Sequence, residues 1–564
     1  MNTHYYNSKI VKWMRVQVRN KYLFIFTISV FIILSICGAG IFINDEWMVA
    51  QELNQLSQGH QILHNEGKYG YYSNGSIGKY MEIRSNVLIY SLALPIISLP
   101  ASLLFTLLST EFTRIFIILL WGLFGLYSLY YISKFISNKL YTISGFLFTI
   151  FVCLNIGYST QFVMVGKFVP YEIIPIVFTN ILLFGVFSVL CYKTSELLFE
   201  DQFKQIVGWI SAISLSSIMF WSTTLKDHLL LSCAIIIICY LQLSNNKNYN
   251  NNYNIIKYIL SGLTLWIRPE VGLPVCISII IYDVYYYKSN LYNISYMIIG
   301  SLPFFINNMV STSNPLLYPF LLSYSNQTGG TLIDQISKPE SQLPILHLFT
   351  ANPIEWIKLI FVPSSGALGL IVPLCLFFFS IVVYLKHRPI ISNNSKFLLI
   401  LGLSTVSYYV LYAGVNLGLD SGVIPDIRYF TPAYALLTMF ALTIIPYEIN
   451  YRKVFKNIFM YTPIIIVLSL FAISVYSPVG ETFKTFRIIP HILSTLSLAI
   501  MLVILVNDKD KKMIGWLNNI IPIAIASACT WQIIIIFVYH ISKAHYYPMF
   551  IPITEILYKL LFGV

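Results

Sequence analysis

The sequence predicts an all-α protein that crosses a lipid bilayer many times. Of its 564 residues, 57% are hydrophobic and only 10% are charged, whereas a soluble domain carries roughly 25% charged residues. Several nearly uncharged stretches hold about 18 apolar residues or more, which is enough for a helix to cross the hydrocarbon of a bilayer. These observations exclude a soluble enzyme, a nucleic-acid-binding protein and a disordered scaffold.

About thirteen segments have the length and composition of a membrane-spanning helix. They are residues 22–43, 113–133, 140–157, 171–192, 207–222, 228–243, 291–309, 366–385, 397–415, 429–446, 458–475, 488–506 and 515–541. Basic residues collect in the short loops between them, which accounts for the net charge of +12. Such loops face the cytoplasm, so the basic segment 1–21 places the N-terminus inside, and an odd number of spans places the C-terminus outside.

Two further apolar segments do not fit this alternation. Residues 87–108 contain Pro95 and Pro100, and we expect a broken helix that lies along the outer leaflet or dips into it. Residues 258–283 carry the tripeptide Arg268-Pro269-Glu270 at their middle, so we expect a re-entrant helical hairpin with Arg268 near its tip. Irregular backbone at membrane depth requires packed protein or a water-filled cavity beside it.

We expect the whole chain, residues 1–564, to form one membrane domain. Residues 44–112 would make the first outer loop with its juxtamembrane helix, and residues 310–355 a second large outer loop. Residues 456–564 would form the C-terminal helices. The eight cysteines form no pair with metal-ligand spacing, and we expect neither a metal site nor a cofactor.

The candidate functional residues are charged groups at the predicted outer ends of spans, where ionisable side chains are costly and often functional. The acidic pair Asp45 and Glu46 directly follows the first span and is the candidate catalytic group. The candidate substrate- and phosphate-binding residues are Lys79, Arg84, Lys167, Lys226, Asp227, His228, Arg268, Glu270, Asp426 and Arg428. Simpler roles stay open: the acidic pair could solvate a helix end, Asp227 could begin a helix, and Glu270 could only neutralise Arg268.

Transfer of a sugar from a lipid-phosphate donor would give this set a common chemistry. A carboxylate has to accept the proton of the acceptor, and Asp45 is suited to that role. Fixed cations have to stabilise the leaving phosphate, as Arg268 and Arg428 could do. Tyrosine and tryptophan side chains near the outer ends could stack on sugars, although an aromatic belt at the membrane interface explains most of them.

The sequence resembles the C-type membrane glycosyltransferases, which include the protein O-mannosyltransferases and the lipid A aminoarabinose transferases. Asp45-Glu46, followed by Ala50 and Gly59, is similar to the DExxxA…G pattern of that superfamily. A Gly/Tyr-rich tract over 67–78, the stretch 262–270 and the stretch 428–432 are similar to its later motifs, in the same order.

The resemblance implies a polyprenyl-phosphate-linked sugar donor, inversion at the sugar carbon and a catalytic aspartate at Asp45. It implies a lipid, glycan or protein acceptor at the extracytoplasmic face of the cell membrane. The chain lacks the Lys-Pro-Pro tract of some members and the WWDxG segment of oligosaccharyltransferases.

Two other functions stay open. A transporter or flippase for lipid-linked saccharides would be equally rich in spans, but it should carry buried charges near mid-bilayer and internal repeats. A polymerase or ligase of such saccharides should have a late outer loop rich in arginine and histidine. The 310–355 loop has a single histidine, His347, and no arginine.

Overall fold

The protein is helical throughout the part of the chain that the computed structural model describes. That part comprises residues 3–41, 46–59, 91–133, 138–159, 171–287, 292–312, 314–316, 353–361, 368–410, 428–445, 448–476, 487–507, 511–542 and 549–562. Besides helices, these residues contain one isolated β-bridge, between Gly38 and Met549. The predicted all-α class is confirmed.

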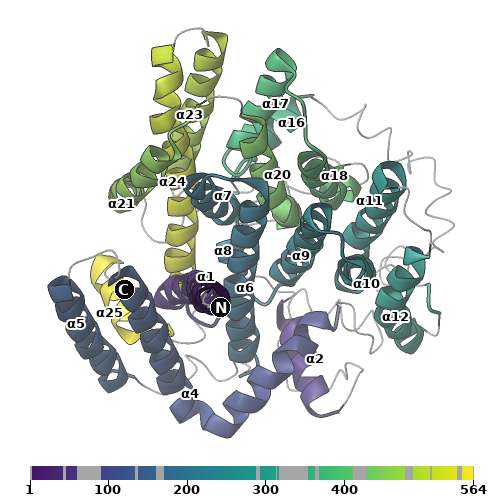
Figure 1. Ribbon diagram of the computed structural model, residues 1–564. Helices are drawn as coiled ribbons and strands as arrows, with labels where there is room; N and C mark the ends of the chain where they lie inside the picture. The colour runs from purple at the N-terminus through teal and green to yellow at the C-terminus, as the bar shows by residue number, and fades with distance from the viewer. Residues whose placement is uncertain are drawn as a thin grey trace.

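The helices follow one another in a long series (Figure 1). They are α1 (Thr3–Ile36), α2 (Glu46–Ser57), α4 (Ala93–Ser133), α5 (Asn138–Gly157), α6 (Ile173–Leu198), α7 (Gln202–Ser214), α8 (Ile218–Trp221), α9 (His228–Lys247), α10 (Asn251–Ile267), α11 (Pro269–Tyr287), α12 (Asn293–Thr312), α16 (Pro353–Phe361), α17 (Cys375–His387), α18 (Asn393–Tyr408), the 3-10 helix η3 (Arg428–Phe430), α20 (Thr431–Ile444), α21 (Tyr451–Tyr476), α23 (Ile488–Val506), α24 (Lys511–Ser542) and α25 (Pro552–Phe562).

Within the described ranges, nine helical segments are long and apolar enough to cross a membrane, judged by length and composition. They are Ala93–Thr110, Phe112–Ser133, Leu140–Gly157, Ile173–Leu198, His228–Lys247, Pro269–Tyr286, Tyr451–Ala472, Ile488–Val506 and Met513–Phe537. The chain is therefore a polytopic membrane protein. The count of about thirteen spans stays a prediction, because several predicted spans are shorter helices or run into residues outside the described ranges.

The interior is built from α6, α9, α20 and α24, whose side chains are mostly buried. Around them, α4, α5 and α21 expose large apolar side chains, among them Leu107, Phe146 and Phe471. Extended apolar surface of this kind is unusual on a soluble protein but suits contact with lipid hydrocarbon. The peripheral helices in Figure 1 therefore present the lipid-facing surface.

The segment predicted as a broken helix over 87–108 differs from that prediction. The helix α4 begins at Ala93 and continues through Pro100, and its break falls at Ser109, where φ is 59° and ψ is 172°. Pro95 lies in the first turn, where a helix does not need the missing N–H. The segment before the break, Ala93–Thr110, is long enough to span a bilayer.

The second predicted irregularity, a hairpin broken at Arg268, is present but longer than expected. Its first arm, α10, begins at Asn251, and its second arm, α11, ends at Tyr287. The segment Pro269–Tyr286 alone has the length and hydropathy of a span. The second arm is therefore long enough to cross a bilayer by itself, which the expectation of a re-entrant hairpin did not include.

The predicted span over 207–222 is not one continuous helix, because α7 ends at Ser214 and the chain bends before α8. Gln532 of α24 stabilises this bend: its Nε2 donates to the carbonyl oxygens of Ile213 (3.1 Å) and Ser214 (2.8 Å). Its Oε1 accepts from the backbone N–H of Met219 at 2.9 Å. Broken helices persist in membranes where protein partners satisfy the freed backbone groups.

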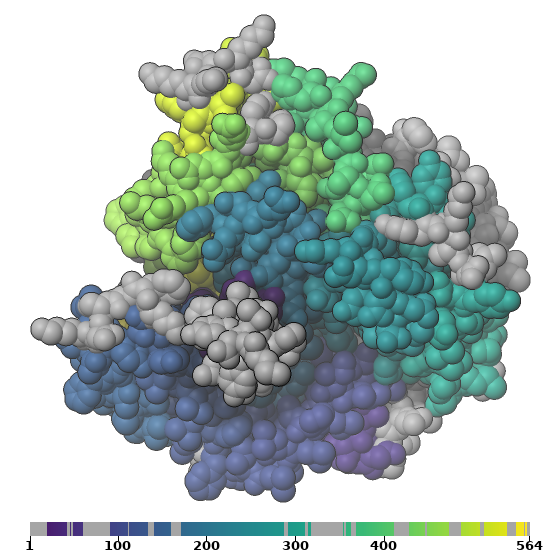
Figure 2. Space-filling view, in the orientation of Figure 1, coloured from purple at the N-terminus to yellow at the C-terminus, as the bar shows by residue number. Residues whose placement is uncertain are grey.

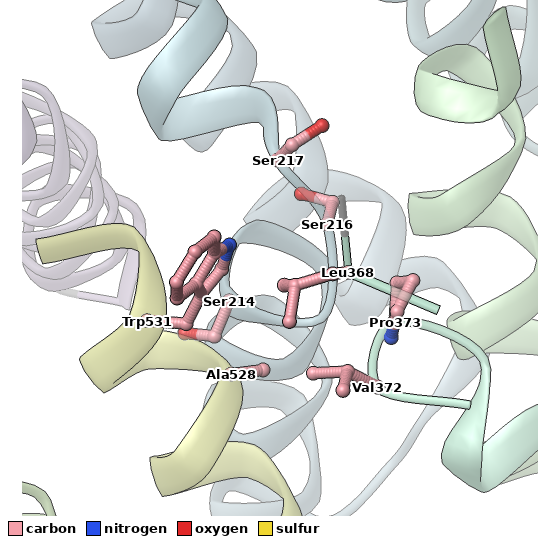
Figure 3. Close-up of a pocket in the computed structure, with 8 residues that line it drawn as sticks. All are labelled: Ser214, Ser216, Ser217, Leu368, Val372, Pro373, Ala528 and Trp531. Atoms are coloured by element: carbon pink, nitrogen blue, oxygen red, sulfur yellow. The ribbon is translucent and has the colours of Figure 1, made fainter. Parts of the chain in front are cut away.

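A small cavity of about 10 Å³ adjoins this bend (Figure 3). It is lined by Ser214, Ser216, Ser217, Leu368, Val372, Pro373, Ala528 and Trp531. A volume of this size holds about one water molecule, so this cavity is too small for a sugar or a lipid phosphate.

Two glycines bring α10 and α12 unusually close together. A Cβ atom built on Gly262 would lie 2.1 Å from the carbonyl oxygen of Met297, and one built on Gly300 would lie 2.0 Å from that of Ile259. Small residues permit this kind of backbone contact between membrane helices. The α10–α12 contact, the most extensive between two helices described, thereby fixes the arm that ends at Arg268.

Candidate active site

Arg268 lies at the break between α10 and α11, and the local sequence explains that break. A residue that precedes proline avoids helical backbone, and Arg268 is extended, with φ −150° and ψ 101°. Pro269 then begins α11, a position that proline favours. Gly272 allows the first turn of α11 to lie against the end of α10, because a Cβ at this position would lie 2.5 Å from the backbone nitrogen of Leu265.

The guanidinium of Arg268 is held by Asp227, which precedes α9. Its Nε and Nη2 donate to the same carboxylate oxygen, Oδ1, at 2.9 and 2.7 Å. Both side chains are only 12% exposed. Asp227 makes no side-chain cap to α9, so its carboxylate serves Arg268 instead of the helix end.

The remaining terminal nitrogen of Arg268, Nη1, is 3.7 Å from Oε1 of Glu270, beyond hydrogen-bond distance. Burial disfavours the charged form of Arg268, but the carboxylate of Asp227 outweighs it and keeps the pKa of Arg268 well above its usual value. The site therefore holds a permanent cation with donor capacity that Asp227 does not use.

Two tyrosines from distant segments complete the surroundings of Arg268. The hydroxyl of Tyr409 donates to Oε1 of Glu270 at 2.9 Å, and the ring of Tyr409 stacks on that of Tyr429, with centroids 4.6 Å apart. Arg268 lies 5.9 Å from the Tyr429 ring. Arg428 lies 4.8 Å from the same ring and donates through Nη2 to its hydroxyl at 2.8 Å. Tyr429 thus lies against both arginines.

The segment that precedes α9 adds a lysine and a histidine to this cluster. Lys226 is 3% exposed and His228 is 1% exposed, and Lys226, Arg268 and Arg428 all lie within electrostatic range of His228. The His228 ring packs against the Trp221 ring, with centroids 4.7 Å apart. Asn180 of α6 fixes this segment by donating to the carbonyl oxygens of Thr224 (2.7 Å) and Lys226 (3.2 Å).

The structure therefore gathers six of the predicted site residues in one place. These residues, which we call the arginine cluster, are Lys226, Asp227, His228, Arg268, Glu270 and Arg428. Among the described residues, the cluster brings three cations beside two carboxylates, and cations of this kind recognise phosphate groups. The rings of Tyr409 and Tyr429 stack on each other beside these cations.

The second catalytic candidate, Glu46, is the first residue of α2. Its side chain is fully buried, and so is that of Glu52 in the same helix. The helix packs along α4, as the purple surface beside the violet-blue one at the lower right of Figure 2 shows. Asn54 also links it to the start of α6, by donating to Glu172 at 3.0 Å.

Several predicted site residues fall outside the described ranges. They are Asp45, Lys79, Arg84, Lys167 and Asp426. Their proposed roles stay predictions. Among the residues that are described, no group of three or more histidine, cysteine or acidic side chains could hold a metal ion.

Some residues of the site were not predicted from the sequence. Tyr409 lies in an apolar stretch with no local signal of function, and Asn180 lies inside the apolar helix α6. A search for polar side chains within predicted spans would have found Asn180, whereas its partners 44 and 46 residues later are visible only in the fold.

Comparisons with known proteins give distant likenesses among solved structures only. No family model and no curated protein matches the sequence. The structure is similar to the crystal structure of ArnT from Cupriavidus metallidurans bound to undecaprenyl phosphate, with a TM-score of 0.44 and 10% sequence identity. The similarity covers 94% of this chain and 78% of that one.

Proposed function

We propose that this protein is an inverting glycosyltransferase that moves a sugar from a polyprenyl-phosphate donor to an acceptor at the outer face of the cell membrane. The observation that carries the proposal is the arginine cluster, in which cations from three separate segments meet beside stacked tyrosines. The acceptor would be a lipid, a glycan or a protein of the cell envelope.

In the proposed reaction, an oxygen of the acceptor attacks the anomeric carbon of the sugar. The bond between that carbon and the phosphate oxygen breaks, and its electron pair leaves with the polyprenyl phosphate. Asp45 accepts the proton of the acceptor oxygen. Arg268, through Nη1, and Arg428 stabilise the negative charge that develops on the phosphate.

The helix α9 supports the proposed outward orientation of the site. This helix has 20 residues and is about 30 Å long, so its ends lie near opposite faces of a bilayer. Its C-terminal end carries Lys247 in its last turn, and we propose that this end faces the cytoplasm by the positive-inside rule. The arginine cluster at the other end then faces outward, on the side predicted for Asp45.

Binding of undecaprenyl phosphate to the purified protein in lipid nanodiscs tests the proposal without knowledge of the sugar. We expect binding of undecaprenyl phosphate and none of undecaprenol, which lacks the phosphate. Arg268→Gln should weaken the binding by about 10- to 100-fold, in line with loss of a charge-assisted hydrogen bond. Arg452→Gln, which alters an exposed arginine of α21, is the control. Equal binding of the alcohol and the phosphate would contradict the proposal.

A further inference from the structure

A second buried ion pair lies away from the arginine cluster, and the proposed reaction does not use it. Nζ of Lys257 in α10 donates to Oδ2 of Asp283 in α11 at 2.5 Å, and the two side chains are 1% and 4% exposed. Asp283 lies inside Pro269–Tyr286, a segment with the length and hydropathy of a span. Ionisable groups within such segments are costly and often functional, so this pair requires an explanation.

Neighbouring side chains extend this pair to a third helix. The same Nζ of Lys257 donates to Oε1 of Gln242 in α9 at 2.5 Å. The hydroxyl of Tyr258 in α10 donates to Oδ2 of Asp283 at 2.9 Å, and both Gln242 and Tyr258 are buried. These four residues, which we call the Lys257 network, join α9, α10 and α11, the neighbouring helices shown in Figure 1.

The same three helices meet a second time at the arginine cluster. Arg268 follows the end of α10, Glu270 lies in the first turn of α11, and Asp227 directly precedes α9. With a rise of about 1.5 Å per residue, the stretch of α10 from Lys257 to Arg268 is about 16 Å long. The three helices are therefore connected by charged side chains at two levels, and Arg268 belongs to one of them.

Stability alone does not account for the Lys257 network. The cost of removing two charges from water offsets much of their attraction, and apolar side chains of similar shape can often replace such a pair without loss of stability. Hydrogen bonds have short and well-defined lengths, whereas apolar contacts have no preferred direction. The network is therefore suited to fixing the placement of the three helices relative to one another.

We propose that the Lys257 network positions Arg268 for phosphate binding, with Lys257 and Asp283 as positioning residues. Arg268 connects the two arms of the hairpin, so a shift of either arm moves its guanidinium relative to Asp227. Gln242 links the network to α9, the helix that Asp227 precedes. An error of about 1 Å in the position of a functional group can cost about 100-fold in rate. The inference rests on the proposed function, because it concerns the same phosphate site.

The test is the double variant Lys257→Met/Asp283→Leu of the full-length protein, which replaces the ion pair by apolar side chains of similar shape. We expect unchanged thermal stability and about tenfold weaker binding of undecaprenyl phosphate in nanodiscs, as for loss of one charge-assisted hydrogen bond. The control is Lys21→Met/Glu196→Leu, which removes an ion pair between α1 and α6 whose side chains are 27% and 22% exposed. The control should bind as wild type.

The same double substitution in an Arg268→Gln background separates positioning from a general structural role. If the network acts through Arg268, it should cause no further loss of binding once Arg268 is absent, a coupling that a double-mutant cycle measures. An equal loss in both backgrounds would overturn the proposal. Wild-type binding by the double variant would also overturn it, and so would weaker binding that is accompanied by an equivalent loss of thermal stability.

Tyr258→Phe provides the test if the double variant does not fold. This substitution removes one hydrogen bond to Asp283 and keeps the ion pair. We expect about threefold weaker binding of undecaprenyl phosphate when Arg268 is present and no effect in Arg268→Gln, and unchanged binding in both backgrounds would overturn the proposal. Failure of the wild type to bind undecaprenyl phosphate would instead overturn the proposed function.

Discussion

Asp227 and Asp201 show how one residue type serves two purposes in this chain. Each aspartate directly precedes a helix. The Asp201 side chain caps α7, accepting from the backbone N–H of Lys204 at 2.6 Å. Asp227 leaves its helix uncapped and binds Arg268 through two hydrogen bonds. Its carboxylate therefore orients a cation of the proposed phosphate site.

This difference predicts unequal effects of the same substitution. Asp227→Asn keeps a hydrogen-bond acceptor but removes the charge that orients Arg268, so we expect kcat/KM for sugar transfer to fall about tenfold, as for loss of a charge-assisted hydrogen bond. Asp201→Asn should leave transfer unchanged, because asparagine caps helices as well as aspartate does. Steady-state kinetics of the two variants provide the measurement, and equal activities would refute the orienting role.

At the residue scale, the sequence indicated the charged members of the site but not their pairing. Arg268 was recognisable because an Arg-Pro-Glu tripeptide interrupts an apolar stretch. Its partner Asp227 lies 41 residues away, and no local pattern connects the two. Tyr409 was missed because a tyrosine in an apolar helix carries no distinguishing signal until its neighbours are known.

Among the elements, the hairpin of α10 and α11 depends on close packing by glycine. Gly262 of α10 allows the carbonyl oxygen of Met297 to approach to within 2.1 Å of where a Cβ would lie. Because backbone atoms cannot move aside as a flexible side chain can, any substitution must separate the two helices.

We therefore expect Gly262→Ala to destabilise the protein by about 1–3 kcal/mol through overpacking. Gly145→Ala is the matched control, because a Cβ at Gly145 in α5 would meet no atom within 4 Å and alanine favours helix. Unfolding of both variants in detergent, followed by circular dichroism, measures the difference. A Gly262→Ala protein as stable as the control would show that α12 does not restrain the hairpin.

The elements could be predicted where hydropathy alone decides them. Ile488–Val506 was anticipated with its bounds because it is apolar from end to end. The span over 207–222 was not, because its bend depends on Gln532, more than 300 residues later. Hydropathy averages over such a bend, and the partner that stabilises it cannot be read from the local sequence.

On the scale of the whole molecule, the structure joins the ends of the chain. The final helix α25 is short, and its sequence predicted no particular partner. Its docking on α1, α4 and α5 depends on backbone carbonyls, on Asn155 and on the buried Arg114, which donates to the carbonyl oxygen of Met549, and the hydropathy pattern does not reveal these partners. The helical class and the membrane location followed from composition, whereas the docking of α25 required the fold.

The proposed reaction needs two contributions from different parts of the sequence. The segment before α2 would supply the carboxylate that acts as the base, and the arginine cluster would supply the cations. If both act in one reaction, loss of the Asp45 carboxylate should strongly reduce transfer and leave the binding of the lipid phosphate unchanged.

The most direct test is therefore the rate of sugar transfer by Asp45→Asn, measured with polyprenyl-phosphate hexoses and pentoses alongside binding of undecaprenyl phosphate. Loss of a general base typically costs about 10²- to 10⁴-fold in rate. We predict a decrease of this size with unchanged phosphate binding. Undiminished transfer by Asp45→Asn would contradict the role of Asp45 as the base and, with it, the central claim.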